Sequence, residues 1–302
     1  MSRIHDALKR AEQERATATG THVDPILEQP DLRNDAQRET MPTLQPAGAT
    51  MMPTMTSGLS YEALVARCPL TEWNPDARTM LFFQEDDNRV GAEEFRTLRS
   101  RLYQIREKLP LKRLLVTSAL PKEGKSFVAA NLAQVLVRQH GRRVLLIDAD
   151  LRNSALHRHL GAAQSPGLAE YLLGECDEFT ALQRGPMENL FFLPAGRPVP
   201  SAAELLANGR LKLLLQRVES MFDWIVLDSS PVIPVSDATL VAGSCDGILM
   251  VVRANVTPSD LARRAREEFP DKLLLGVVLN GAPSGKLAQS KYYDGEAVNS
   301  QA

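Results

Sequence analysis

The sequence predicts an α/β fold in which a mostly parallel sheet is covered by helices on both faces. Short, nearly continuous apolar runs alternate with helical runs over residues 113–279. Such apolar runs are typical of strands buried on both faces, and the helical runs supply the crossovers that parallel strands need. One apolar run leads into a Gly-Lys-Ser loop and two others end in aspartates. This pattern predicts a ligand site at the carboxyl edge of the sheet.

The composition indicates one substantial domain with an extension. The chain has 302 residues, of which 44% are hydrophobic, and this is enough for a sizeable core. Its formal net charge of −2 argues against general nucleic-acid binding, so we expect no nucleic-acid partner. Cys68, Cys176 and Cys245 lie far apart without a CxxC pair, which predicts neither a disulfide framework nor a metal site and indicates a reducing compartment.

Targeting segments are not apparent in the sequence. No stretch approaches the ~18 consecutive apolar residues that a membrane-spanning helix needs. The charged N-terminus also lacks the apolar core of a secretory signal. We therefore expect a cytoplasmic protein whose membrane association, if any, comes through a partner.

The residues before the main domain fall into two segments. Apolar residues at helical spacing over residues 1–16 predict a short amphipathic helix that docks on a partner or frays. Residues 17–60 are rich in Thr, Pro, Gln, Met and Asp without an aromatic residue, which predicts a disordered linker. Aromatic residues return at Tyr61, and we expect the domain with its lead-in over residues 61–285 and a flexible tail over residues 286–302.

Residues 93–108 predict a strongly periodic helix in front of the sheet. One face of this helix carries Phe95, Leu98, Leu102 and Ile105. On the opposite face arginines outnumber glutamates. The residues alone favour a solvated face that carries ion pairs along the helix.

After this helix, apolar and helical runs alternate in the way expected of a parallel sheet. Each apolar run has the length of a buried strand. The predicted strands are residues 113–117, 143–147, 190–193, 224–227, 247–252 and 273–279. Helical runs between them are residues 126–138, 203–207, 211–221 and 259–269.

The run from Thr117 to Ser126 predicts a phosphate-binding loop between the first strand and the helix that follows it. A loop that ends in Gly-Lys-Ser and opens a helix turns backbone N–H groups toward one point, where the helix dipole also favours negative charge. Lys125 can reach terminal phosphates, and the Ser126 hydroxyl can hold magnesium. The fold class is thereby narrowed to a sheet of the P-loop NTPase type. The expected nucleotide-binding residues of the loop are Ala119, Leu120, Pro121, Lys122, Glu123, Gly124, Lys125, Ser126 and Phe127.

Two residues depart from the usual pattern of this loop. Ala119 replaces the first glycine of the motif, and Lys122 stands where a small flexible residue is expected. Alanine fits if its φ is negative, whereas a lysine is strained if its φ is positive. The sign of φ at Lys122 therefore determines whether the loop adopts the usual conformation without strain.

Three aspartates follow apolar strands. Asp148 and Asp150 come after residues 144–147, and Asp228 comes after residues 224–227. In a parallel sheet these strand ends share one edge with the phosphate loop, where carboxylates bind or orient magnesium. A lone aspartate at a strand end is more often a turn or cap residue. Three of them beside a Gly-Lys-Ser loop instead predict a magnesium–nucleotide site.

These residues resemble the bacterial tyrosine kinases of capsular and extracellular polysaccharide systems, a branch of the P-loop ATPases with deviant Walker motifs. The resemblance depends on residues 119–126 as Walker A, 145–152 as the family's Walker A′ and 225–228 as Walker B. It covers about residues 91–281. The opening residues 1–12 are similar to those of soluble autokinases found in exopolysaccharide loci.

The resemblance implies roles for the residues at the sheet edge. Lys125 would hold the β and γ phosphates of ATP, and Ser126 and Asp228 would bind Mg²⁺. Asp148 would be the base toward a tyrosine hydroxyl, with Asp150 nearby on magnesium or its waters. The implied catalytic residues are Lys125, Asp148 and Asp150. The implied metal ligands are Ser126, Asp150 and Asp228.

The resemblance also implies contacts away from the phosphates. Asn280 would contact the adenine. Glu93, Arg96 and Arg99 match a Glu-x-x-Arg-x-x-Arg element that the family uses for subunit contact. The resemblance therefore favours a ring-like oligomer over a solvated helix face.

The family's tails carry a tyrosine cluster that accepts phosphate. Here Tyr292 and Tyr293, in the polar tail, are the implied phosphoacceptors. Two adjacent tyrosines are a small cluster, and they could equally be ordinary tail residues. The resemblance implies phosphorylation between copies of the chain.

The resemblance implies an ATP-dependent tyrosine autokinase that regulates exopolysaccharide or capsule biosynthesis and export. Its implied partners are a membrane-bound polysaccharide co-polymerase (a chain-length determinant), further copies of the chain and a tyrosine phosphatase. One alternative is a positioning ATPase of the ParA and MinD type, which carries an additional lysine where this chain has Leu120. A second alternative is a regulatory ATP-binding module without transfer activity, favoured by Lys122 and by the small number of tail tyrosines.

Overall fold

The computed structural model describes residues 59–83 and 90–282. The chain divides into two units, Met1–Met55 and Thr56–Ala302, and every described residue belongs to the second unit. Within the described part, no helix is both long and apolar enough to cross a membrane.

Three predictions fall outside the described residues. They are the amphipathic helix over residues 1–16, nearly all of the linker over residues 17–60, and the tail over residues 286–302 with Tyr292 and Tyr293. All three stay predictions.

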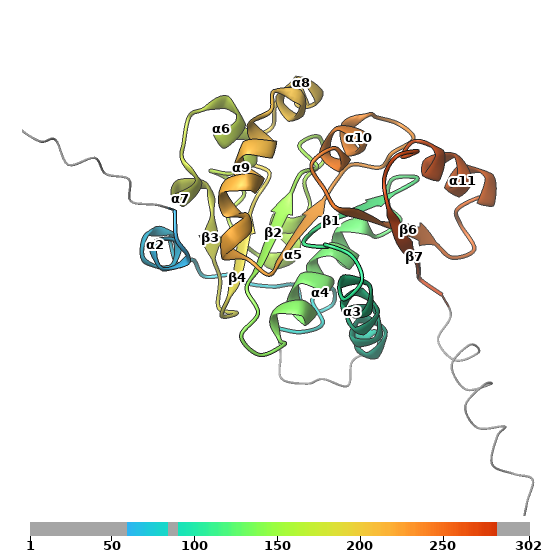
Figure 1. Cartoon of the computed structure of the whole chain (residues 1–302), viewed down its shortest axis with the longest axis horizontal. Helices are drawn as coiled ribbons and strands as arrows, with labels where there is room; N and C mark the ends of the chain where they lie inside the picture. Colours follow the sequence, from blue (N-terminus) through green and yellow to red (C-terminus); the bar gives the residue numbers. More distant parts are fainter. Residues whose placement is uncertain (1–58, 84–89, 283–302) are drawn as a thin grey trace, which may run out of the picture. The chain divides into compact units, whose positions relative to one another are not determined.

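One seven-stranded sheet forms the centre of the described unit, in the order β3-β4-β2-β5-β1-β6-β7 (Figure 1). Six of its strands are parallel, and β3 alone runs antiparallel to its neighbour β4. The predicted mostly parallel sheet is therefore confirmed. The strands are β1 (Arg113–Ser118), β2 (Val144–Asp148), β3 (Gln183–Arg184), β4 (Leu190–Leu193), β5 (Trp224–Asp228), β6 (Gly247–Arg253) and β7 (Leu274–Asn280).

Side chains of the sheet alternate between two cores, one on each face. In β2, Leu145 and Ile147 belong to one core, and Val144 and Leu146 belong to the other. Helices cover both faces, as predicted (Figure 1). The core of Leu145 includes residues of α6 (Leu168–Leu173), α7 (Glu178–Ala181), α8 (Ala202–Ala207), α9 (Arg210–Val218), α10 (Asp237–Ala242) and α11 (Ser259–Glu267). The core of Val144 includes residues of α3 (Ala92–Arg106), α4 (Lys125–Val137) and α5 (Leu156–Leu160).

The differences from the predicted elements concern short segments. All six predicted strands are present, with ends shifted by at most one residue. Strand β3 was not predicted, because its two residues are too few to show alternation. Five helices of four to seven residues were missed for the same reason, since they are too short to show a 3.6-residue period. These missed helices are α2 (Tyr61–Arg67), α5, α6, α7 and α10.

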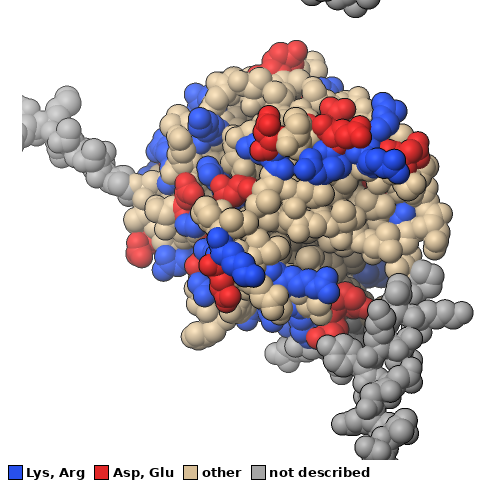
Figure 2. Space-filling model, turned by 45° about the vertical axis from the view of Figure 1, so that its right-hand side comes forward, with Lys and Arg blue, Asp and Glu red and all other residues tan. Residues whose placement is uncertain are grey.

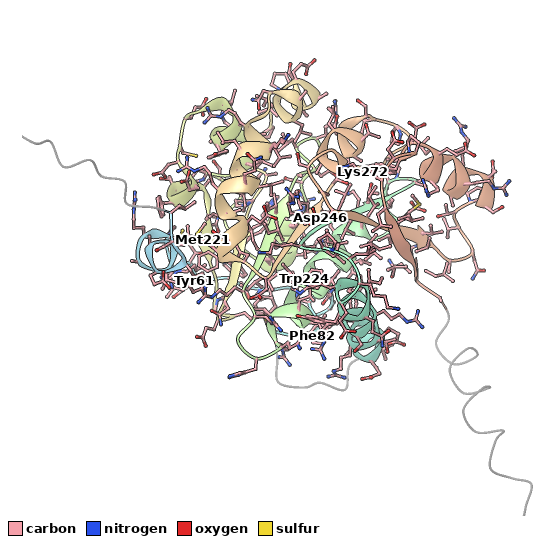
Figure 3. The ribbon with its side chains drawn as sticks, viewed as in Figure 1. Tyr61, Phe82, Met221, Trp224, Asp246 and Lys272 are labelled. Atoms are coloured by element: carbon pink, nitrogen blue, oxygen red, sulfur yellow. The ribbon has the colours of Figure 1, made fainter. Side chains whose placement is uncertain are left out.

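The segment before α3 packs against the sheet and α4. Tyr61 lies in α2 (Figure 3). Its hydroxyl hydrogen-bonds to Oδ1 of Asn189. Further along, the backbone N–H of Leu81 donates to Oδ1 of the buried Asn131 at 2.8 Å. The Asn131 amide in turn donates to the backbone oxygen of Thr79 at 2.8 Å. One side chain of α4 therefore satisfies both a donor and an acceptor of the lead-in.

Charged side chains of both signs are mixed on the surface. On the face drawn in Figure 2, lysines and arginines lie among aspartates and glutamates. The nearly balanced composition, with 35 basic and 37 acidic residues, is consistent with this mixing. Local neutralisation of this kind leaves no extended basic stripe on that face.

Asp246 holds the start of β1 against the turn that precedes β6 (Figure 3). Its Oδ2 accepts hydrogen bonds from the backbone N–H groups of Lys112 and Arg113, at 2.9 and 2.7 Å. Its Oδ1 accepts from Nε and Nη2 of Arg113 at 3.1 and 2.7 Å. Burial alone would raise the pKa of Asp246, but the hydrogen bonds from Arg113 and Lys112 and the charge of Arg113 together hold the pKa below its ordinary value.

We predict that Asp246→Ala lowers the free energy of unfolding by about 2 to 4 kcal/mol, because it leaves a guanidinium and two backbone donors without their acceptor. The pKa of this carboxyl is lowered in the folded state, so its stabilisation is present above about pH 4 and is lost as the pH falls through the folded value. Urea unfolding at pH 7 and pH 3 measures both effects. The matched control is Asp271→Ala at an exposed site. Equal stability of wild type and Asp246→Ala at pH 7 would contradict this role.

Candidate active site

The phosphate loop lies between the end of β1 and the start of α4, as its sequence predicts. Gly124 precedes the helix with a φ of 94°. A Cβ at this position would lie 2.1 Å from Nδ2 of Asn280, so only glycine fits. That Asn280 nitrogen donates to the backbone oxygen of Glu123 at 2.8 Å. The end of β7 therefore braces the loop directly.

The two departures from the loop pattern have different outcomes. Ala119 is fully buried and does not have a positive φ, so alanine fits in place of the glycine. Lys122 has a φ of 67° and is therefore strained, as expected for a side chain in the left-handed region. The strain lies next to the glycine that opens the helix.

Glu123 is buried beneath the phosphate loop, which its place in the motif does not suggest. Its side chain is only 2% exposed. Oε2 accepts a hydrogen bond from the backbone N–H of Leu120 at 2.7 Å, and Oε1 contacts the hydroxyl of Thr257. Thr257 was missed by sequence reasoning, because it lies 134 residues away and belongs to no motif. The Glu123 carboxylate thus shapes the loop from inside.

The sheet brings the predicted carboxylates together around Lys125. Strands β2 and β5 are neighbours, and their register places Asp148 directly opposite Asp228. Nζ of Lys125 lies 2.9 Å from Oδ2 of Asp150, and both side chains are nearly buried. Burial alone would lower the pKa of Lys125, but the carboxylates of Asp228 and Asp150 raise it above its ordinary value. The lysine is therefore held protonated where phosphates would arrive.

Asp148 is fully buried and held by the backbone. Its two oxygens accept hydrogen bonds from the N–H groups of Asp150 and Leu156, both at 3.2 Å. Burial, with the nearby charges of Asp228 and Asp150, raises the pKa of Asp148 well above its ordinary value. A raised pKa is what a carboxylate needs to act as a base near neutral pH.

Asp228 lacks the hydrogen bonds that a buried carboxylate needs. It is fully buried, and neither oxygen has a hydrogen-bond partner among the described residues. Burial raises its pKa to about 6, although the charge of Lys125 and the Ser126 hydroxyl lower it. An orphaned carboxylate beside a serine hydroxyl fits a magnesium ion.

The protein groups do not make a complete metal cage. No group of three or more His, Cys, Asp or Glu side chains in the described part is arranged to hold a metal ion. Magnesium characteristically takes one or two carboxylates and completes its shell with phosphate oxygens and waters. The donors Ser126 and Asp228 therefore fit a magnesium ion that arrives with a nucleotide.

A second ion pair positions the segment that follows Asp150. Nε and Nη2 of Arg152 donate to the two carboxylate oxygens of Asp237 at 2.6 and 3.1 Å. Asp237 is 1% exposed and begins α10. Sequence reasoning placed Arg152 in the Walker A′ segment but did not pair it with Asp237, since 85 residues separate them. The pair ties the end of β2 to α10.

The predicted subunit-contact residues lie on α3. Nη1 of Arg96 pairs with Oε2 of Glu93 at 3.0 Å within the helix. Nη1 of Arg99 donates to the backbone oxygen of Val135 at 3.0 Å. Val135 lies near the end of α4, whereas the phosphate loop precedes the beginning of α4, so these arginines lie roughly 15 Å along the helix from the loop.

Comparisons with known proteins agree with this geometry. A family model described as an AAA domain matches residues 123–257. The chain is 33% identical over 206 residues to the tyrosine-protein kinase YwqD of Bacillus subtilis, which covers 68% of this chain and 86% of YwqD. It is 35% identical over 209 residues to the succinoglycan biosynthesis transport protein ExoP of Rhizobium meliloti, which covers 68% of this chain but 26% of ExoP.

A solved structure supports the same relation. The kinase domain of the Escherichia coli tyrosine kinase ETK matches with a TM-score of 0.59 and 30% identity, over 67% of this chain and 80% of that domain. Identity at this level over most of a related chain, with the same fold in a solved kinase domain, confirms the resemblance drawn from the motifs. The chain belongs to the family of bacterial tyrosine-protein kinases, which is built on a P-loop ATPase fold.

Proposed function

We propose that this chain is an ATP-dependent protein-tyrosine autokinase that regulates exopolysaccharide or capsule biosynthesis and export. The observation that carries the proposal is the ion pair between Lys125 and Asp150, set beside Asp148 and Asp228 at the end of the phosphate loop. One lysine among three carboxylates matches the needs of phosphoryl transfer, in which charge neutralisation and positioning supply most of the acceleration.

The loop and the strand ends contact different parts of the magnesium–ATP complex. Lys125 and the backbone N–H groups at the start of α4 bind the ATP phosphates. Ser126 and Asp228 would hold Mg²⁺, and Asp150 would serve the ion or its waters. Magnesium supplies neutralisation of the charge that develops on the transferred phosphoryl group. We assign the adenine contact to Asn280, whose hydrogen bond to the backbone oxygen of Glu123 keeps it beside the loop.

Asp148 serves as the base toward the acceptor. As the tyrosine oxygen bonds to the γ-phosphorus, the bond to the ADP oxygen breaks and the hydroxyl proton moves to a carboxylate oxygen of Asp148. The raised pKa of Asp148 supports this role. The acceptors are Tyr292 and Tyr293 of another copy of the chain.

The polysaccharide assignment is supported by relatives. ExoP is named a succinoglycan biosynthesis transport protein, and this chain aligns with 26% of it. The part of ExoP outside the aligned region would correspond, for this chain, to a separate membrane-bound co-polymerase that binds it. A tyrosine phosphatase would reverse the modification.

Lys125→Met is expected to reduce ATP affinity and phosphotyrosine formation by about 100-fold or more, because it removes the cation that binds the phosphates. The measurement combines a fluorescent ATP analogue with mass-spectrometric mapping of phosphotyrosine. Tyr292→Phe/Tyr293→Phe should keep nucleotide binding and lose the modification. Lys212→Met, at an exposed position, is the matched control. Phosphotyrosine that persists in Lys125→Met would refute the mechanism. ATP binding without phosphotyrosine in any sample would favour a regulatory ATP-binding module.

Asp228→Asn is expected to stabilise the fold and to weaken magnesium-dependent ATP binding. In magnesium-free buffer at pH 8 it should raise the free energy of unfolding by about 1 to 3 kcal/mol, because it removes a buried carboxylate that is costly to ionise. The folded pKa is raised to about 6, so the advantage is complete above that pH and disappears toward pH 4, where wild-type Asp228 is protonated.

The same substitution should weaken ATP binding with magnesium present and leave binding in EDTA unchanged. Urea unfolding across this pH range and ATP titrations with and without magnesium measure both effects. Asp260→Asn, at an exposed site, controls for loss of charge alone. Magnesium dependence equal to that of wild type would remove Asp228 from the metal site.

The basic face of α3 supports a homo-oligomer. Arg96→Ala/Arg99→Ala is expected to shift the assembly toward monomers, because oriented arginines suit ion pairs across an interface. Light scattering of the purified chain at several concentrations measures the shift. Arg101→Ala, exposed on the same helix, should leave the assembly unchanged. Because Arg99 also binds the end of α4, a thermal melt must show that both variants stay folded. An unchanged assembly in a folded double variant would count against this interface.

A further inference from the structure

Lys122 adopts a backbone conformation that disfavours its own side chain. Its φ of 67° lies in the left-handed region. In the described residues, the other non-glycine residues with positive φ are Asn189 and Asn255, and asparagine tolerates this region better than lysine does. A glycine at this position would remove the strain. The lysine therefore calls for a reason outside local folding.

Neighbouring groups impose this conformation. Nη1 of Arg253 donates to the backbone oxygen of Lys122 at 3.2 Å. The buried Glu123 carboxylate accepts from the N–H groups of Leu120 and Arg253 at 2.7 and 3.4 Å. These contacts hold the backbone on both sides of Lys122 and make no use of its side chain. Strain maintained in this way is characteristic of functional sites.

The two lysines of the loop face different surroundings. Lys125 is 12% exposed, and its ammonium lies against Asp150. Lys122 is exposed, and its ammonium makes no ion pair or hydrogen bond within residues 59–83 and 90–282. Arg253, which holds the Lys122 backbone, is exposed as well. Lys125 thus serves the buried phosphate position, while Lys122 offers a positive charge at the surface of the same loop.

The acceptor segment carries the complementary charge. In the sequence, Tyr292 and Tyr293 are followed by Asp294 and Glu296. We propose that Lys122 is a specificity-determining residue that binds these two carboxylates in the tail of a second copy of the chain. The proposal rests on the proposed kinase function, since it concerns the acceptor of that same site. Opposite charges beside the loop and beside the acceptor favour encounter and select the correct segment.

The test uses the full chain with Tyr292→Phe, Tyr293→Phe, Asp294→Asn and Glu296→Gln, so that its own tail neither accepts phosphate nor competes by charge. Two fluorescent peptides of residues 286–302 are compared, the natural one and an Asp294→Asn/Glu296→Gln peptide. Their dissociation constants come from anisotropy with Mg²⁺ and ATP present. Peptide and ATP KM values come from phosphotyrosine formation.

With Lys122 present, the natural peptide should bind about 3- to 10-fold more tightly than the neutral peptide. Lys122→Gly should bind both peptides equally, and Lys122→Arg should restore the preference. The ratio of the two dissociation constants is the readout of the proposal, because Lys122 belongs to the nucleotide-binding loop and its substitution can change the KM for ATP as well. Because glycine relieves the strain, Lys122→Gly should also melt about 2 to 4 °C higher than the parent chain.

A preference for the natural peptide that survives in Lys122→Gly would overturn the proposal. A higher KM for ATP in Lys122→Gly, with the peptide preference unchanged, would overturn it too and assign Lys122 to the phosphates. Phosphotyrosine formed equally on both peptides by the parent would refute this inference and leave the kinase function standing. A Lys122-dependent binding preference without any phosphotyrosine would refute the kinase function and retain the recognition.

Discussion

The burial of three carboxylates around one lysine is the constraint on which the site depends. The register of β2 and β5 places Asp148 opposite Asp228, and the helix that follows β1 carries Lys125 to Asp150. Carboxylates this deeply buried repel one another, and Lys125 compensates only part of their charge. The raised pKa values of Asp148 and Asp228 are the measurable consequence.

This charge imbalance couples folding to ligand binding. If all three carboxylates ionise, they leave two negative charges uncompensated beside Lys125. A divalent cation supplies that difference, and the orphaned oxygens of Asp228 are where its coordination would be most favourable. A ligand that binds only the folded state also stabilises it. The free chain therefore gives up stability to keep a site suited to a metal-bound nucleotide.

The sequence was sufficient for features that depend on local pattern. Apolar runs of four to seven residues predicted six strands, and the Gly-Lys-Ser loop and the aspartates followed from their positions at strand ends. Contacts between distant residues could not be read in this way. Thr257 meets Glu123, and Arg152 meets Asp237, only because the strand order brings their loops together. The sequence could predict only that Lys122 is strained if its φ is positive, because the sign of that φ depends on contacts with the end of β6.

The two halves of the reaction differ in how far the protein is prepared for them. On the nucleotide side, Gly124, Asn280 and Glu123 hold the loop in a defined conformation, so binding phosphates requires little rearrangement. On the acceptor side, Asp148 is fully buried, and both of its oxygens are occupied by backbone N–H groups. Under the proposed mechanism a tyrosine hydroxyl would have to reach this buried carboxylate past the segment that follows β2, which Arg152 ties to α10. In that mechanism, access of the acceptor rather than binding of the nucleotide would be the step at which this fold controls transfer.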